Sequence, residues 1–411
     1  MFTIIKSCRL CGNELRPLFD VPAPLVSCFP GRSDAQPPAI PTVVVQCLYC
    51  EHVQLWHTTA PELLYGDYWY ESGVNERMRQ ELATVVTRAQ DYCTIDRADA
   101  VLDLGANDGT LLREYQRQCP STRPHLVAVD PSPTFQSGLR VFCDATIQGC
   151  FPDCVRQVPD YLYKVITTIA MFYDLPDPVA AAQEIRRLLH PAGVWVCQFQ
   201  DLEQQVRAGA WDNFVHEHLS YHTLKTFQSV CVQAGLQVVD VERTDINGGS
   251  LRVFVKQWGQ DQERPAVREQ LYAEYATLHD KWPRDFQIRM RANIRQIQTY
   301  VEYAAAQGPV DLYGASTKAN TLLQATGVSG LLRWAWERNP RKVGRFTVTG
   351  VPITSEAEGR QDPPYALLSG IWQFKKQLIA REAETLKTTR LIVPLPEATW
   401  VETSEPERKR A

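Results

Sequence analysis

The chain has 411 residues, of which 44% are hydrophobic and 22% charged, and its 43 basic and 47 acidic side chains give a net charge of −4. A chain of this length predicts two or three domains rather than one core. The acidic balance disfavours a nucleic-acid-coating surface, because such surfaces cluster excess Lys and Arg. The first residues lack the apolar core of a secretory signal, and no apolar run approaches the ~18 residues of a membrane span. We therefore expect a cytoplasmic protein without a membrane partner.

Two C-x2-C knuckles lie near the amino terminus, formed by Cys8 with Cys11 and by Cys47 with Cys50. Each knuckle directs two thiolates at one ion, and two knuckles complete a tetrahedral four-cysteine zinc site. Such a site has no open coordination position, so the zinc is expected to be structural. A redox pair or free thiols are the alternatives. Two histidines are possible substitute ligands, His52 and His57.

Strands and helices alternate from Ala100 onward. The expected elements, in chain order, are a strand, turn and helix in 100–119, a strand in 125–130, a strand and turn in 163–178, an amphipathic helix in 179–193 that Gly193 closes, and a strand in 194–200. This alternation indicates βαβ units and a mainly parallel sheet.

The turn after the first of these strands, residues 103–109, reads DLGANDG and differs from the G-x-G-x-x-G dinucleotide fingerprint. A G-x-N-D-G loop lets the backbone approach a cofactor that lacks phosphates, and an aspartate ending the second strand can accept hydrogen bonds from two ribose hydroxyls. The combination is typical of the S-adenosylmethionine (SAM) site of class I methyltransferases. A Rossmann domain that binds a dinucleotide, or nothing, is the alternative. The candidate cofactor residues are Asp103, Gly105, Asn107, Asp108, Gly109, Asp130 and Met171.

Motifs along nearly the whole chain occur in an order that resembles the sugar C-methyltransferase family. After the paired knuckles come LDLGANDGTLL, HEHLSY, NGGSLRVFV, LYGASTKANTLL and LIVPLP. Members of that family methylate C-3 of nucleotide-linked 4-keto-deoxysugars, in the biosynthesis of antibiotics and surface polysaccharides. The resemblance implies an α/β protein with a zinc-binding module at 1–70, a class I methyltransferase domain at 71–245 and a Rossmann-like substrate-binding domain at 246–411.

The resemblance also implies an enolate mechanism. A base removes a proton beside the ketone, and the enolate carbon attacks the SAM methyl. In the family the base is a histidine directly after a glutamate, which corresponds to His218. An imidazole suits this role, because its usual pKa near 6.5 leaves it neutral and receptive at cellular pH. Glu217 would orient or tune the imidazole, and His216 would bind substrate or support the loop.

Two positions depart from the family pattern. The sugar enzymes carry a tyrosine two residues before the glutamate, where this chain has Val215. Tyr173 stands near a place where those enzymes tend to have histidine. Tyr173 or Tyr221 could supply the missing hydroxyl. Both departures lie where the substrate should react, so O-methylation of a sugar, or methylation of another enolisable small molecule, is the competing hypothesis.

The carboxyl-terminal part begins with long helices, expected within 263–307. Residues 309–327 predict a strand, a Gly-Ala-Ser turn and a helix, an arrangement that offers backbone N–H groups and a positive dipole end to a diphosphate. By resemblance this turn helps to hold a nucleotide-sugar; a turn that only packs the domain is the alternative. Its candidate side-chain donors are Ser316, Thr317, Lys318 and Asn320. Residues 342–356 and 388–396 predict later strands of the same sheet.

Two further residues are candidate substrate contacts. Tyr70 is our best match to a tyrosine that approaches the active site in the family, although a surface or packing role is equally compatible with the sequence. Asn247 opens an N-G-G-S segment that predicts either a substrate-facing loop or a plain tight turn.

Two other classes of function are compatible with parts of the sequence. A zinc-ribbon scaffold that engages nucleic acid or a partner is disfavoured by the acidic balance. A metalloenzyme centred on His218 and His222 is the other, although their surroundings do not form an H-E-x-x-H motif. The sequence leaves the oligomeric state open.

Overall fold

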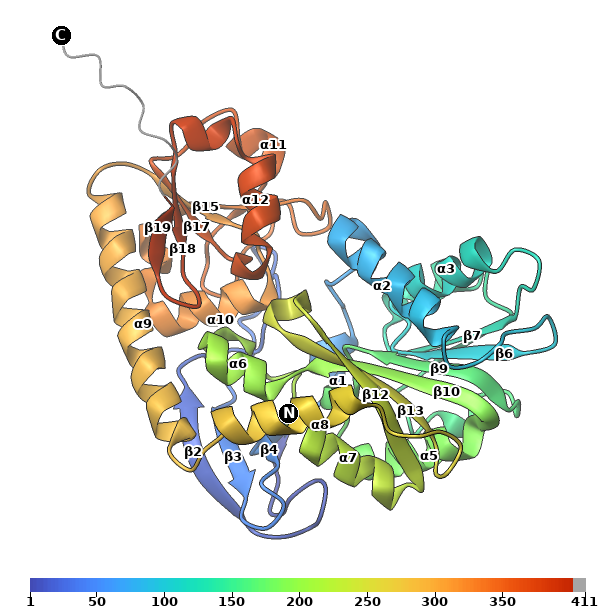
Figure 1. Cartoon of the computed structure of the whole chain (residues 1–411). Helices are drawn as coiled ribbons and strands as arrows, with labels where there is room; N and C mark the ends of the chain where they lie inside the picture. Colours follow the sequence, from blue (N-terminus) through green and yellow to red (C-terminus); the bar gives the residue numbers. More distant parts are fainter. Residues whose placement is uncertain (402–411) are drawn as a thin grey trace. The chain divides into compact units, whose positions relative to one another are not determined.

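The computed structural model describes residues 1–401. The chain forms two compact units, each assembled from separated stretches of sequence (Figure 1). The first unit contains residues 1–17, 45–204 and 217–279, and the second contains residues 18–44, 205–216 and the chain from 280 onward. The boundaries expected at residues 70 and 245 stay predictions.

A seven-stranded sheet in the order β12-β13-β10-β9-β6-β7-β8 forms the centre of the first unit. Its strands are β6 (Ala100–Leu104), β7 (His125–Asp130), β8 (Ala145–Gln148), β9 (Tyr163–Ile169), β10 (Leu189–Gln200), β12 (Leu236–Thr244) and β13 (Ser250–Gln257). Strands β6 to β10 pair in parallel, and β13 is antiparallel to both of its neighbours. The predicted βαβ arrangement and the α/β class are thereby confirmed.

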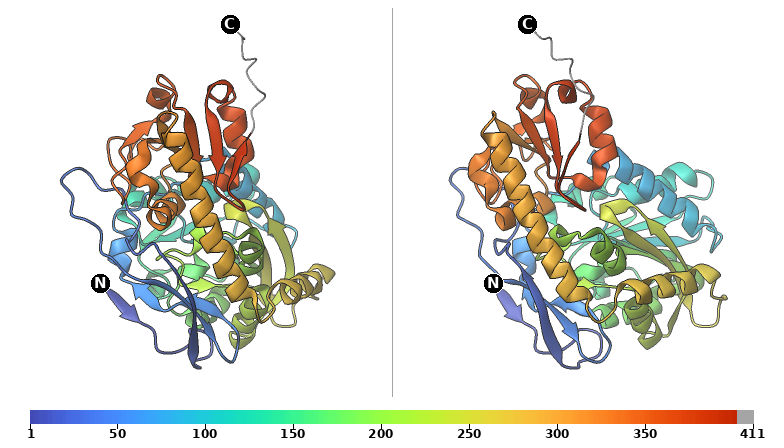
Figure 2. Two further views of the ribbon diagram at one scale, coloured as in Figure 1. Left: turned by 90° about the vertical axis from the view of Figure 1, so that its left-hand side faces the viewer. Right: turned by 60° about the vertical axis from the view of Figure 1, so that its left-hand side comes forward.

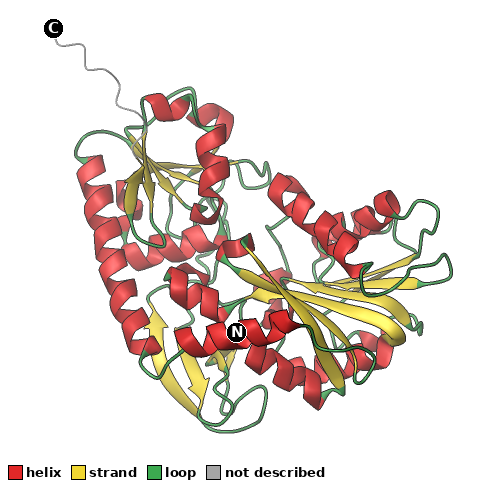
Figure 3. Cartoon of the chain, viewed as in Figure 1, coloured by secondary structure: helices red, strands yellow, loops and turns green. Residues whose placement is uncertain are grey.

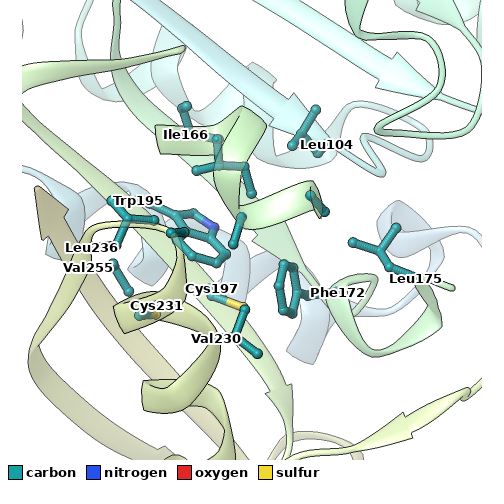
Figure 4. Packing of buried hydrophobic residues seen from close by; sticks show 14 of the residues in the cluster. Leu104, Ile166, Phe172, Leu175, Trp195, Cys197, Val230, Cys231, Leu236 and Val255 are labelled. Atoms are coloured by element: carbon teal, nitrogen blue, oxygen red, sulfur yellow. The ribbon is translucent and has the colours of Figure 1, made fainter. Parts of the chain in front are cut away.

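Helices cover both faces of this sheet (Figure 3). They are α2 (Glu76–Ala89), α3 (Thr110–Gln118), α4 (Pro133–Leu139), α5 (Pro178–Leu188), α7 (Leu224–Gln233) and α8 (Pro265–Thr277). A further helix, α6 (Leu202–Ala208), follows β10 where the chain passes from the first unit to the second. In β6, Leu102 and Leu104 enter the core beneath α5 and α7, whereas Val101 enters the core beneath α2 and α3, because successive side chains of a strand alternate between faces. Figure 4 shows Trp195, Phe172 and Val230 packed in the first of these cores.

The predicted helix at 179–193 is too long. Helix α5 ends at Leu188, and β10 begins at Leu189, so Gly193 lies in a strand and does not close the helix. A Cβ at Gly193 would lie 2.8 Å from the Lys164 carbonyl oxygen and 2.9 Å from that of His190. The glycine therefore permits close approach of β10 to β9, where the pairing register shifts between Leu189 and Val194.

The amino-terminal part contributes two small sheets. Strand β1 (Phe2–Ile4) pairs with β5 (His57–Thr59), and β2 (Leu15–Val21), β3 (Thr42–Cys47), β4 (Val53–Leu55) and β11 (Ser220–Tyr221) form a sheet in the order β11-β4-β3-β2. A short helix, α1 (Pro61–Tyr65), follows. Strand β4 pairs with β11, and the Leu55 N–H donates to the Leu219 carbonyl at 2.9 Å. The knuckle segment therefore supports the chain directly after His218.

The second unit contains a six-stranded sheet in the order β16-β15-β14-β17-β18-β19. Its strands are β14 (Val310–Tyr313), β15 (Leu332–Glu337), β16 (Ile353–Ser355), β17 (Ala366–Ser369), β18 (Arg390–Val393) and β19 (Thr399–Val401), and all pairs except β18 with β19 are parallel. Its helices are α9 (Trp282–Ala305), α10 (Thr317–Thr326), α11 (Glu356–Gly359) and α12 (Lys375–Arg381). The long α9 packs against α10 and β14 (Figure 2).

Three of the four expectations for this part are confirmed, namely long helices within 263–307, a strand, turn and helix within 309–327, and a strand within 388–396. The fourth, a strand across 342–356, is largely wrong, because only Ile353–Ser355 pairs in the sheet. The preceding residues form a local turn instead, in which the Thr347 N–H donates to the Val351 carbonyl and Phe346 forms an isolated β-bridge with Pro352. Within residues 1–401, every helix is too short or too polar to cross a membrane.

Candidate active site

The turn between β6 and α3 has the shape expected of a cofactor loop. Gly105 has φ +76° and Asn107 φ +51°, a region that glycine and asparagine adopt most readily. A Cβ at Gly105 would lie 2.8 Å from Met171 Cγ. Met171 opens the turn after β9, so the cofactor loop and this turn are in direct contact, and Gly105 is the residue that permits it.

Asp130 ends β7 beside this loop. Its Oδ2 accepts the Asn107 N–H at 2.8 Å, and its Oδ1 accepts the Ser132 N–H at 2.9 Å. Burial raises the pKa of this carboxyl to about 6, against the effect of the two N–H donors. A carboxylate has about four acceptor positions, so each oxygen can accept a further bond from a ribose hydroxyl. Asp130 therefore fits the sugar of SAM.

Asp103 lies beneath the loop, and the Thr167 hydroxyl donates to its Oδ1 at 2.6 Å. Burial, with a smaller effect from the charge of Asp130, raises the pKa of Asp103 to about 7. Its side chain is 3% exposed. These contacts suit a residue that supports the loop.

A segment that sequence reasoning did not connect with the cofactor loop is bonded to it. The Ser72 N–H donates to Asn107 Oδ1 at 3.0 Å, and the Gly73 N–H donates to Asp108 Oδ2 at 2.7 Å. Asn107 Nδ2 in turn donates to the Tyr70 carbonyl at 3.0 Å. We call residues 70–73 the docking segment. The side chains of Asn107 and Asp108 are engaged in holding it, and direct contacts of these two with cofactor stay predictions.

His218 lies beside the turn that follows β9. Its ring packs edge-on against that of Tyr173, with centroids 4.5 Å apart and an interplanar angle of 69°. Tyr173 belongs to the short helix Phe172–Asp174. Residues 171–174 therefore contact the cofactor loop through Met171 and the predicted base through Tyr173. Their catalytic roles stay predictions, but the fold brings them together.

Two carboxyl groups share this neighbourhood, Asp174 and Glu217. Burial raises the pKa of Asp174 well above its usual range, and the charge of Glu217 raises it further. Burial raises the pKa of Glu217 to about 7. Asp174 was missed by sequence reasoning, because an aspartate in D-L-P-D-P is typical of an ordinary turn.

The segment around α1 adds tyrosines to the same neighbourhood. Burial, followed by the charges of Asp174 and Glu217, raises the pKa of Tyr65 and of Tyr68 well above the usual range, so these phenols stay neutral. The Tyr70 side chain is 44% exposed, and its contact with the cofactor loop is made by its backbone carbonyl. A substrate role for Tyr70 stays a prediction. We call Tyr65, Tyr68, Tyr173, Asp174, Glu217 and His218 the acceptor cluster.

The other histidines of the opening motif have different surroundings. His216 lies in the second unit, where its Nε2 is 2.8 Å from the Ile40 carbonyl and 3.2 Å from Thr42 Oγ1. His222 is fully buried and packs against Phe172 and Phe199. His216 thus has contacts that suit loop support, and His222 those of a core residue.

The four knuckle cysteines form a candidate metal centre. Their Sγ atoms all lie within 4.8 Å of one another, and among residues 1–401 this group contains neither His52 nor His57 and neither His218 nor His222. The Sγ atoms of three pairs are separated by 3.4–3.6 Å, near the roughly 3.8 Å that tetrahedral Zn–S bonds of about 2.3 Å require. The donor set and spacing fit zinc.

The predicted nucleotide residues surround the start of α10. The Ser316 hydroxyl caps the helix by accepting the Ala319 N–H at 3.1 Å and donates to the Gly370 carbonyl. Burial lowers the pKa of Lys318 to about 8, and the charge of Asp212 opposes this shift. The Asn320 amide is engaged within the fold, since it donates to Ser27 and accepts from the Val348 N–H. A contact of Asn320 with a nucleotide stays a prediction, and Lys318 is the side chain of this group best suited to an anion.

Tyr221 and Asn247 have mainly local roles in the structure. Tyr221 is 2% exposed and lies in β11, paired with Val53 of β4. Asn247 adopts φ +57° within the short helix Ile246–Gly248, which suits a tight turn. Their substrate contacts stay predictions.

Comparisons with known proteins give the class of this protein. Residues 74–241 match the methyltransferase domain, and residues 245–396 match the C-methyltransferase C-terminal domain. The chain is a SAM-dependent methyltransferase. It is 28% identical over 420 residues to the C-methyltransferase NovU of Streptomyces niveus, covering 96% of each chain. The two matched domains and this relative together confirm the resemblance to C-methyltransferases.

Two solved structures are similar to part of this chain. One is a complex that contains the Haloferax volcanii Trm112 methyltransferase activator, with a TM-score of 0.37 and 19% identity over 45% of this chain and 94% of that chain. The other is the mitomycin 7-O-methyltransferase MmcR, with a TM-score of 0.36 and 14% identity over 44% of this chain and 53% of that chain.

Proposed function

We propose that this methyltransferase transfers the methyl group of SAM to C-3 of a nucleotide-linked 4-keto-deoxysugar. The observation that carries the proposal is the turn at 171–174, which contacts the cofactor loop through Met171 and packs against His218 through Tyr173. A base beside the methyl donor is what carbon methylation next to a ketone requires. O-methylation, the competing hypothesis raised by Val215, needs no enolate.

In this proposal His218 removes the proton from the carbon beside the ketone, because a neutral imidazole accepts a proton near cellular pH. Tyr173 holds the imidazole ring by its edge contact. Glu217, which directly precedes the base, stabilises the imidazolium once it is ionised. Asp130 and the backbone of the cofactor loop hold SAM, which supplies an electrophilic methyl group. The tyrosines of the acceptor cluster line the acceptor side.

The four-cysteine group holds a structural zinc ion in this proposal. An all-thiolate centre leaves no coordination position for substrate. Its contribution is to hold β4, which pairs with β11 just after His218. In the second unit, Ser316, Thr317 and Lys318 at the start of α10 bind the diphosphate of the nucleotide, with the helix N-terminus favouring negative charge.

The test is incubation with nucleotide-linked 4-keto-deoxysugars and SAM that carries a ¹³C methyl group, followed by NMR of the product. A new methyl carbon on C-3 supports the proposal. A methyl on C-5, the other carbon beside the C-4 ketone, would correct the position but retain the chemistry. An O-methyl signal would replace it by the competing hypothesis. His218→Asn should abolish transfer while SAM binding, measured by calorimetry, is retained.

A further inference from the structure

The Asp174 side chain carries an unused polar atom next to the proposed reaction centre. Its Oδ1 is buried and has no hydrogen-bond partner in the structure. Such an atom is costly to bury unless a ligand or water pairs with it. Asp174 directly follows Tyr173, whose ring packs against His218, and the same turn contacts the cofactor loop through Met171. Asp174 therefore lies on the turn that contacts both the base and the cofactor loop.

The groups around Asp174 come from several elements. Glu217 and His218 lie in the loop before β11, Tyr65 and Tyr68 lie in and just after α1, and Tyr173 lies on the same turn. Asp174 interacts electrostatically with Glu217, Tyr65 and Tyr68. Ionisation of Asp174 is disfavoured both by burial and by Glu217. Glu217 is raised by burial alone, to a pKa of about 7, so it is the carboxyl of the two that ionises first.

We propose that Asp174 acts as a neutral carboxylic acid that donates a hydrogen bond to the ketone oxygen of the acceptor, whereas ionised Glu217 supports the imidazolium of His218. This assignment rests on the proposed function and adds a second catalytic residue to it. Two neighbouring carboxyl groups then take different roles because their surroundings separate their protonation states.

The reaction balances with these groups. His218 takes the proton from the carbon beside the ketone, and the electron pair of that C–H bond forms the C=C bond as the C=O electrons move onto oxygen. The Asp174 O–H stabilises this oxygen by its hydrogen bond and keeps its proton. The enolate carbon then bonds to the methyl carbon, the C–S bond breaks with its electron pair on sulfur, and the ketone re-forms. The proton on His218 passes to solvent.

The experiment compares Asp174→Ala with Asp174→Asn. The acceptor is a nucleotide-linked 4-keto-deoxysugar, and the two readouts are methyl transfer and solvent deuterium exchange beside the ketone without SAM. Loss of one oxyanion donor lowers kcat by about 10²–10³-fold, so Asp174→Ala should lose that much in both readouts with an unchanged KM for SAM. Asp174→Asn keeps an N–H donor of nearly the same shape and should stay within about tenfold of wild type. Asp177→Asn is the matched control, because Asp177 is an exposed cap of α5 in the same segment and asparagine caps equally well.

Each outcome decides one question. If the wild-type protein methylates the sugar and Asp174→Ala does so at a rate within twofold of wild type, the role of Asp174 is overturned and the proposed function stands. The role of Asp174 is also overturned if Asp174→Asn is as impaired as Asp174→Ala while both variants have the same melting temperature. That result would mean that the reaction requires an ionised carboxylate at this position. Wild-type protein that methylates no keto sugar, and exchanges no deuterium, would remove the proposed function and this assignment with it. If Asp174→Ala has a lower melting temperature than wild type, the activity of Asp174→Asn decides whether the position needs a hydrogen-bond donor or an ionised carboxylate.

Discussion

The docking segment gives the sharpest structural prediction. In Gly73→Ala, the new Cβ would lie 2.8 Å from Asp108 Oδ2 and 3.0 Å from Thr110 Oγ1, whereas ordinary contacts begin near 3.4 Å. Asp108 cannot easily move away, because its Oδ1 accepts both the N–H and the hydroxyl of Thr110. The segment must therefore lift off the cofactor loop.

The magnitude follows from the bond that breaks. The Gly73 N–H bond to the Asp108 carboxylate is 2.7 Å long, and a hydrogen bond to a charged group contributes about 1.5–3 kcal/mol. Amide hydrogen exchange of residues 70–75 should then be about 10- to 100-fold faster in Gly73→Ala than in wild type. SAM affinity should fall by no more than the same factor, because the coupling cannot exceed the docking energy.

The assay is hydrogen exchange with mass spectrometry, paired with calorimetric SAM titration. Gly138→Ala is the matched control, since nothing lies within 4 Å of a Cβ at that helical glycine, and it should leave both measurements unchanged. Unchanged exchange at 70–75 in Gly73→Ala would refute the reasoning that this segment docks through Asp108.

Three further predictions follow from the site. Cys47→Ser, or removal of the metal by a chelator at neutral pH, should lower both the melting temperature and the rate of methyl transfer, because β4 supports the strand after His218. The control Cys28→Ser, at a cysteine outside the metal group, should lower neither. Full activity of the metal-free protein would contradict the structural role of the centre. Asp130 has a pKa of about 6, and it loses acceptor capacity when it protonates. SAM affinity should therefore fall by up to about tenfold per pH unit below pH 6 and should be constant above pH 7. Calorimetry between pH 5 and 8 measures this dependence, and an equally steep dependence in Asp130→Asn would reject the assignment. Tyr173→Phe preserves the edge contact with His218, so deuterium exchange should stay within about threefold of wild type, and a 100-fold loss would instead assign the phenol hydroxyl to the chemistry.

The distribution of the H-E-H motif between the two units is a consequence of folding that bears on catalysis. His216 bonds to Ile40 and Thr42 within the second unit, whereas Glu217 and His218 belong to the first. We expect His216 to support the chain that leads to the base. Substitution of His216 should therefore lower the stability of the protein more than His218→Asn does.

Local sequence determined the features that depend on short-range geometry. The spacing of the C-x2-C knuckles fits a tetrahedral centre, and the glycine-containing turn after β6 needs positive φ angles that few residues adopt. The alternation of apolar strands with amphipathic helices was sufficient to predict the parallel sheets, because each period matches one kind of element. The resemblance that named His218 rests on motifs of this local kind.

Only the tertiary structure decided which residues meet. Asp174 belongs to an unremarkable turn in sequence, and it acquires its unpaired oxygen and its perturbed ionisation only when Glu217 and the tyrosines near α1 fold against it. The docking segment reaches its partners across 35 residues, and β10 could take residues 189–193 from the predicted helix because β9 lies beside them. Such contacts depend on burial and on partners distant in the chain, and neither is encoded in any short stretch of residues.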